Sequence, residues 1–90
     1  MLQTVRIIIK GKVQAVFFRQ STKEKAIGLN ITGHVKNLPD GTVEIIATAN
    51  EEQLQELLQW CNHGPPRAVV TDIISTPVPL QPFNNFIIIR

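Results

Sequence analysis

Strand-like and helix-like hydrophobic patterns alternate along this chain in a definite order. Residues 4–11 place apolar side chains at every second position, as in a strand with one buried face. Residues 18–29 instead repeat apolar side chains at helical spacing. In chain order the patterns predict a strand at 4–11, a helix at 18–29, strands at 31–37 and 43–49, a helix at 51–61, and strands at 67–75 and 86–89.

This order of elements is that of the split βαβ arrangement, the ferredoxin-like sandwich. We therefore predict an α+β fold in which two helices cover one face of an antiparallel sheet of four to five strands. Ninety residues are enough for one compact core, so we expect residues 1–90 to form a single domain.

Local signals mark the boundaries of these elements. Asp40-Gly41 is a hairpin signal between the second and third strands, and Asn50 with Gln53 can form a capping box at the second helix. Paired apolar residues within 69–74 blur the phase of the fourth strand and suggest a bulge. The prolines at 77–82 predict a loop.

Composition limits the class of protein. The chain is 43% hydrophobic and 18% charged, as expected for a globular core. No apolar stretch approaches the roughly 18 residues of a membrane helix, and the N-terminus lacks the apolar segment of a secretory signal. The single cysteine, Cys61, excludes an internal disulfide. We expect a cytoplasmic monomer without a membrane partner.

Positive charge is concentrated in the first part of the chain. Residues 1–36 hold seven Lys and Arg and one acid (+6), whereas residues 37–90 hold two Arg and six acids (−4). A basic half can attract an anion. A surface of solvated lysines explains the same pattern.

Several familiar kinds of site are absent from the sequence. We find no Ser/His/Asp set at a recognisable spacing, no His/Asp/Glu cluster typical of a metal site and no G-x-x-x-x-G-K-[ST] nucleotide loop. Cys61 lies in the apolar stripe of the second predicted helix, which favours a place in the core. We therefore expect neither a metal nor a cofactor.

The connection from Gly11 to Arg19 remains as the candidate site. A loop that leads into a helix N-terminus presents unpaired backbone N–H groups at the positive end of the helix dipole, which suits an anion. Arg19 lies in the first helical turn, where a cation is disfavoured by about 0.3–1 kcal/mol. A bound phosphate would explain both features. A solvent-exposed arginine at a helix start is the alternative.

The run G-K-V-Q-A-V-F-F-R at 11–19 resembles the acylphosphatase signature G-x-V-Q-G-V-x-F-R. Further matches follow in order: G-H-V-K-N at 33–37, D-G-x-V-E at 40–44 and G-P-P-x-A at 64–68. The resemblance covers nearly the whole chain. It implies the ferredoxin-like fold and the hydrolysis of acyl phosphates to a carboxylate and inorganic phosphate, without a metal or a covalent intermediate.

The resemblance also implies roles for individual residues. The side chain of Arg19 and the backbone N–H groups of the loop would hold the phosphate, and Asn37 would position the attacking water. The loop residues concerned are Gln14, Ala15, Val16, Phe17 and Phe18. Without the resemblance, Asn37 is more simply a turn residue before the hairpin. Because no residue is an obvious general acid, we expect only a good leaving group, such as a carboxylate of pKa about 4.3, to be expelled.

Ala15 departs from the signature, which has glycine at this position. If position 15 requires a positive φ, alanine costs about 1–2 kcal/mol there, and we expect reduced activity. A non-catalytic module that binds anions or acyl phosphates is therefore the main alternative to an enzyme.

Nucleic-acid binding is a second alternative, because RNA-recognition domains share this topology. Those domains stack bases on aromatic side chains exposed on the sheet. The predicted strands at 4–11 and 43–49 contain no aromatic residue. We expect no nucleic-acid partner. Whether a regulatory protein binds this chain stays an open question at this point.

Overall fold

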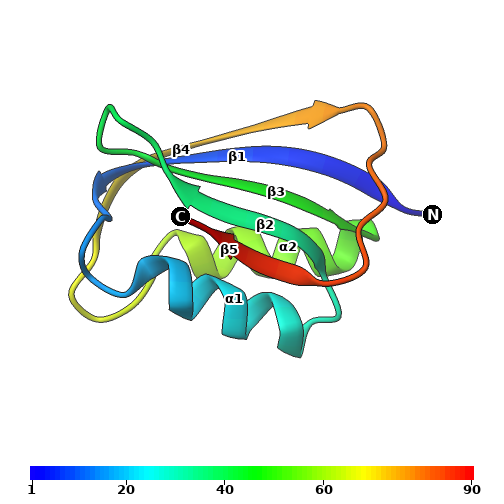
Figure 1. The fold of residues 1–90 in the computed structure, drawn as a ribbon, viewed down its shortest axis with the longest axis horizontal. Coiled ribbons are helices and arrows are strands. Elements are labelled where there is room, and N and C mark those ends of the chain that lie inside the picture. Colours follow the sequence, from blue (N-terminus) through cyan, green and yellow to red (C-terminus); the bar gives the residue numbers. More distant parts are fainter.

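The computed structural model describes all residues, 1–90, and confirms the predicted order of strands and helices. The elements are β1 (Gln3–Lys12), α1 (Phe18–Gly28), β2 (Thr32–Asn37), β3 (Val43–Ala49), α2 (Glu51–Cys61), β4 (Val69–Val78) and β5 (Phe86–Ile89). Both helices lie on the same side of one sheet (Figure 1). The ferredoxin-like arrangement is therefore confirmed.

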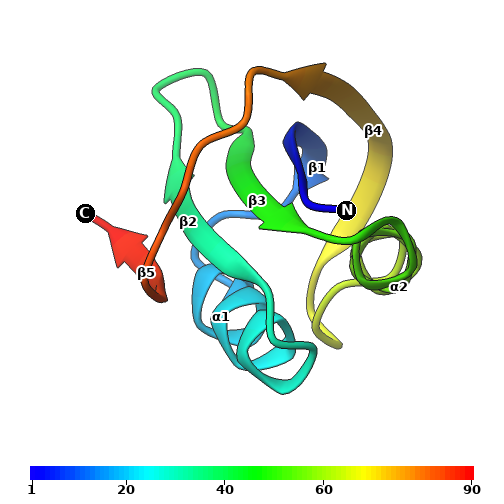
Figure 2. The same ribbon diagram turned by 90° about the vertical axis from the view of Figure 1, so that its right-hand side faces the viewer.

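The sheet has the strand order β4-β1-β3-β2-β5. The first four strands along the chain are antiparallel to their neighbours, as predicted, but β5 pairs in parallel with β2. The chain must cross from one edge of the sheet to the other between β4 and β5, and the crossing segment 79–85 is visible in Figure 2. Because β4 ends where β2 begins, the chain enters β5 in the direction of β2.

The crossing segment 79–85 is fastened to the sheet by its backbone. The N–H of Gln81 donates to Thr4 Oγ1 at 2.9 Å, and its carbonyl accepts from Thr48 Oγ1 at 2.8 Å. The N–H of Gly33 donates to the carbonyl of Asn85 at 2.9 Å. These bonds fix the position from which β5 starts.

Strand β4 contains the predicted bulge, but it spans Val69–Val78 where the sequence predicts 67–75. Lys10 opposes Asp72 while Gly11 opposes Val70, so one β4 residue is unpaired and the predicted bulge is confirmed. The expected loop at Pro77 is wrong, because Pro77 lies within β4. An edge strand tolerates proline, since the missing N–H need not join the ladder.

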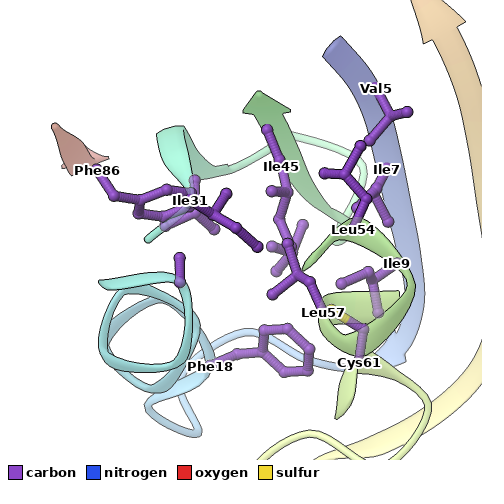
Figure 3. Close-up of a cluster of buried hydrophobic side chains, with 14 of the residues drawn as sticks. Val5, Ile7, Ile9, Phe18, Ile31, Ile45, Leu54, Leu57, Cys61 and Phe86 are labelled. Atoms are coloured by element: carbon purple, nitrogen blue, oxygen red, sulfur yellow. The ribbon is translucent and has the colours of Figure 1, made fainter. Parts of the chain in front are cut away.

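The core lies between the sheet and the two helices. Seventeen buried apolar residues form one cluster, and Figure 3 shows side chains from the strands meeting side chains from both helices. Phe18, Leu57 and Cys61 are almost completely inaccessible to solvent. Burial of a large apolar side chain contributes about 1.5–3 kcal/mol, so this cluster is the main source of stability.

Polar residues end the helices as predicted. The side chain of Asn50 accepts a hydrogen bond from the N–H of Gln53, and the side chain of Gln53 accepts one from the N–H of Asn50. Asn30 follows α1 with φ 59, the left-handed conformation that ends many helices. Neither helix is long and apolar enough to span a membrane.

Candidate active site

The loop between β1 and α1 is held to the core by two valines. Just before it, near the end of β1, lies Gly11, where φ is 125 and a Cβ would overlap the carbonyl oxygen of Val69 on β4. Only glycine therefore fits at this point. Further along, Val13 and Val16 are buried and leave the residues beside Val16 exposed. The loop is thus an ordered part of the fold whose tips face outward.

The backbone of this loop alternates in handedness. Ala15 has φ 59 and Phe17 has φ 63, and the intervening Val16 has a negative φ. Such alternation turns successive backbone N–H groups toward one concave side, the nest geometry that binds anions. Ala15 thus has the positive φ that the sequence analysis considered, and alanine in this conformation costs about 1–2 kcal/mol.

Helix α1 starts without the groups that usually satisfy a helix N-terminus. Phe17 is the N-cap and offers no side-chain hydrogen bond, and the first turn contains no acidic residue. Phe18 anchors the helix by packing against Trp60, with ring centroids 5.7 Å apart. Arg19 is half-buried beside it. The free N–H groups and the guanidinium together favour a negative ligand.

Asn37 is the last residue of β2. It follows Val35 by two positions and so shares the face of the sheet that the helices cover. Its Oδ1 is buried and has no hydrogen-bond partner within the protein. A buried acceptor without a partner is uncommon in folded proteins and invites a ligand or water.

One cavity of about 420 Å³ brings the loop, the start of α1 and the end of β2 together. This volume is within the range of small-molecule sites. In Figure 1 the same three segments lie at one end of the molecule, near the C-terminus. The cavity is lined by Val13, Ala15, Phe17, Phe18, Arg19, Gln20, Asn37, Ile88 and Arg90.

The cavity unites most of the predicted site residues. Arg19 and Asn37 both line it, although they come from different elements. Gln14 and Val16 do not line it: the Gln14 side chain is directed to carbonyls of the β2–β3 turn, and Val16 is turned into the core. Phosphate binding by their backbone N–H groups stays a prediction.

Ile88 and Arg90 also line the cavity but are not among the site residues predicted from the sequence. In the parallel pairing Ile88 opposes Val35, so the alternating residues of β5 continue toward Asn37 and the cavity. Residues 86–89 are all apolar, so their sequence carries no alternation that would indicate which side chains share a face. The sequence also does not reveal which strand β5 pairs with.

Three groups with shifted pKa values lie outside the cavity. Burial raises the pKa of the Cys61 thiol to about 12. Hydrogen bonds from the hydroxyl and N–H of Thr42 lower the pKa of Asp40. Burial lowers the pKa of His34, and the nearby Glu44 opposes that effect. None of the three is placed to transfer a proton in the cavity.

The fold and the cavity define a ferredoxin-like domain with a cavity at a strand-to-helix junction. The family model described as Acylphosphatase matches residues 5–88. An acylphosphatase of Marinobacter nauticus is 47% identical over 81 residues, which are 89% of this chain and 88% of that protein. The chain therefore belongs to the acylphosphatase family, as the sequence resemblance predicts.

Solved structures agree with this assignment. The crystal structure of acylphosphatase from Bacillus subtilis has a TM-score of 0.95 and 38% identity, with all of both chains covered. An acylphosphatase structure from Coxiella burnetii has a TM-score of 0.93 and 34% identity, covering 97% of this chain and 92% of that one. The backbone of the whole chain thus follows that of its relatives.

Proposed function

We propose that this chain hydrolyses small acyl phosphates to a carboxylate and inorganic phosphate, with Arg19 and the 14–18 loop holding the phosphoryl group and Asn37 holding the attacking water. Membership of the acylphosphatase family supports the reaction. The observation that supports the roles is that Asn37, whose Oδ1 is buried and has no hydrogen-bond partner, lines the same cavity as Arg19.

The phosphoryl oxygens would meet two kinds of donor. Left-handed Ala15 and Phe17 arrange backbone N–H groups as a nest, and the uncapped start of α1 adds its own. The guanidinium of Arg19 would supply two parallel hydrogen bonds and a positive charge. Phosphoryl transfer depends chiefly on positioning and on such neutralisation of charge.

The water would be held by Asn37. A side-chain amide offers both an acceptor and donors, so Asn37 can orient water although it is not a base. The water oxygen would form a bond to phosphorus while the bond from phosphorus to the acyl oxygen breaks. The electron pair leaves on the carboxylate, and the proton of the water passes to phosphate or solvent.

The lining of the cavity favours mixed anhydrides as substrates. It contains no carboxyl, imidazole or thiol group that could protonate a leaving group. A carboxylate leaves unaided, since its conjugate acid has a pKa of about 4.3, but a phenolate of pKa about 10 does not. We propose that the reaction needs no metal and that residues 1–90 act as one monomeric domain in the cytoplasm.

The non-catalytic alternative rests on Ala15, whose strain weakens the loop. Steady-state hydrolysis of benzoyl phosphate by the wild type and by Asn37→Ala separates the two functions. We expect the wild type to hydrolyse benzoyl phosphate. In Asn37→Ala we expect kcat to fall about 100-fold, because the attacking water is no longer held in place. Inhibition by inorganic phosphate should change little in the variant. Binding of phosphate without turnover by the wild type would instead favour the binding module.

A further inference from the structure

The side chain of Gln14 joins the loop to the turn between β2 and β3. Its Nε2 donates to the carbonyl of Leu38 at 2.8 Å and to the carbonyl of Thr42 at 2.9 Å. An amide nitrogen has two protons, so both are used. Gln14 is half-buried and does not line the cavity. Its side chain is therefore committed to the protein and not to a ligand.

Those two bonds connect the two halves of the candidate active site. Ala15 follows Gln14 directly and lines the cavity, and Leu38 follows Asn37, which lines it from the other side. No other hydrogen bond joins residues 13–17 to residues 37–42. The amide is thus the only polar link between the loop and the strand end that carries Asn37.

The turn that receives these bonds is itself rigid. The N–H of Leu38 donates to the carbonyl of Thr42, and the side chain of Asp40 accepts from the N–H and hydroxyl of Thr42. The two carbonyl groups that accept hydrogen bonds from Gln14 are therefore held in place by the turn. The loop, in contrast, contains Ala15 in a left-handed conformation that costs about 1–2 kcal/mol.

We propose that Gln14 is a positioning residue that sets the distance between the phosphate loop and Asn37, an inference that rests on the proposed function. Each hydrogen bond is worth about 0.5–1.5 kcal/mol, enough to hold a strained loop in register. Displacement of reacting groups by about 1 Å can cost 100-fold in rate. The Gln14 side chain acts through Asn37 and touches no substrate.

A double-mutant cycle on benzoyl phosphate tests this role. Gln14→Met keeps the length of the side chain and removes both donors. We expect kcat to fall about 10-fold in the wild-type background, because the water is misplaced. In the Asn37→Ala background the same change should alter kcat less than about twofold, since coupled residues are not additive. The inhibition constant of inorganic phosphate should stay within about threefold of that of the wild type.

Gln53→Met is the matched control. Gln53 also donates an amide hydrogen bond to a backbone carbonyl, that of Leu29 at 2.7 Å, but it lies outside the cavity. Loss of this bond and of its cap should lower stability by about 1 kcal/mol and leave kcat unchanged. Near-UV circular dichroism of Trp60 checks folding, and all rates are taken where each variant is native. Gln14→Lys retains donors for both carbonyls and should recover most of the kcat lost in Gln14→Met.

Three results would overturn the role of Gln14. One is an equal fall in kcat in both backgrounds, and another is a loss of phosphate inhibition with kcat unchanged. The third is a Gln14→Met protein with wild-type kinetics. An inactive wild type, or an Asn37→Ala variant with full activity, would contradict the proposed function itself. Those results differ from the three that would overturn only the role of Gln14.

Discussion

Asn37 at the end of β2 and Arg19 in the first turn of α1 line the same cavity, and the Oδ1 of Asn37 is buried without a hydrogen-bond partner. The sheet brings the strand end to the start of the helix, because β2 lies near the edge that α1 covers. A cation and a neutral amide thus meet at a helix N-terminus. This pairing suits an anion that reacts with water.

Ala15→Gly should stabilise the protein and raise turnover. Alanine in the left-handed region costs about 1–2 kcal/mol, which glycine would avoid. Glycine also raises the conformational entropy of the unfolded chain, which lowers stability by about 0.4–1 kcal/mol. We expect a net gain of up to about 1.6 kcal/mol, or a Tm higher by several degrees. Calorimetry and kcat on benzoyl phosphate measure both effects.

Asn30→Gly is the control for Ala15→Gly. Asn30 has the same φ of 59 but lies outside the cavity, and asparagine tolerates this region better than alanine. Its replacement should change neither Tm nor kcat appreciably. If Ala15→Gly left both quantities unchanged, the backbone strain at position 15 would have no energetic role.

Arg90→Gln should weaken the binding of substrate more than the chemical step. Arg90 lines the cavity but is exposed, so its charge is largely screened by solvent. We expect KM for benzoyl phosphate to rise about three- to tenfold at low salt, with kcat within about twofold, and the difference to shrink in 0.5 M salt, where the Debye length is only a few ångströms. A large fall in kcat would contradict this and show that Arg90, like Arg19, acts in the chemical step.

Much of the site could be predicted from sequence because its signals are local. Arg19 stands at a change of hydrophobic period, and the match at 33–37 pointed to Asn37. The position of Arg90 could not be predicted from the sequence, because it depends on the parallel pairing of β5 with β2. The direction of the Gln14 side chain was equally hidden, since its partners lie in a turn more than twenty residues away.

Cys61 should be unreactive in the native protein. It is fully buried, and burial raises its pKa to about 12, so almost no thiolate exists at pH 8. We expect no reaction with Ellman's reagent over minutes at pH 8, and one equivalent of thiol after unfolding in guanidinium chloride. Blocking reagents should likewise leave hydrolysis unaffected. Rapid labelling of the folded chain would show that α2 opens readily at its C-terminal end.

His34 should make stability fall as the pH is lowered. Its pKa is depressed in the folded protein, chiefly by burial, so the unfolded chain takes up a proton first as the pH falls below about 6.5. The Nδ1 has no partner, and the ring packs edge-on against Phe83 with centroids 5.8 Å apart. The stability contributed by neutral His34 is fully present at a pH above the pKa of the unfolded chain. It is lost as the pH falls from that value through the lower pKa of the folded protein.

His34→Gln measures the contribution of this imidazole. Between pH 7.5 and pH 5.5 the urea midpoint of the wild type should fall more than that of the variant, because glutamine does not titrate. His63, which is exposed, is common to both proteins and cancels in the comparison. Equal falls in the two midpoints would mean that His34 is protonated as readily in the native state as in the unfolded one.

Hydrolysis of an acyl phosphate and an aryl phosphate, side by side, by the wild type and by Arg19→Gln tests most directly whether Arg19 and a good leaving group together allow turnover. Arg67→Gln removes the same charge from an exposed position outside the cavity and serves as the control. We expect the wild type and Arg67→Gln to cleave only benzoyl phosphate and Arg19→Gln to be slower by about 1,000-fold, as for other arginines that stabilise phosphoryl transfer. Equal rates on both substrates, or full activity of Arg19→Gln, would contradict this expectation.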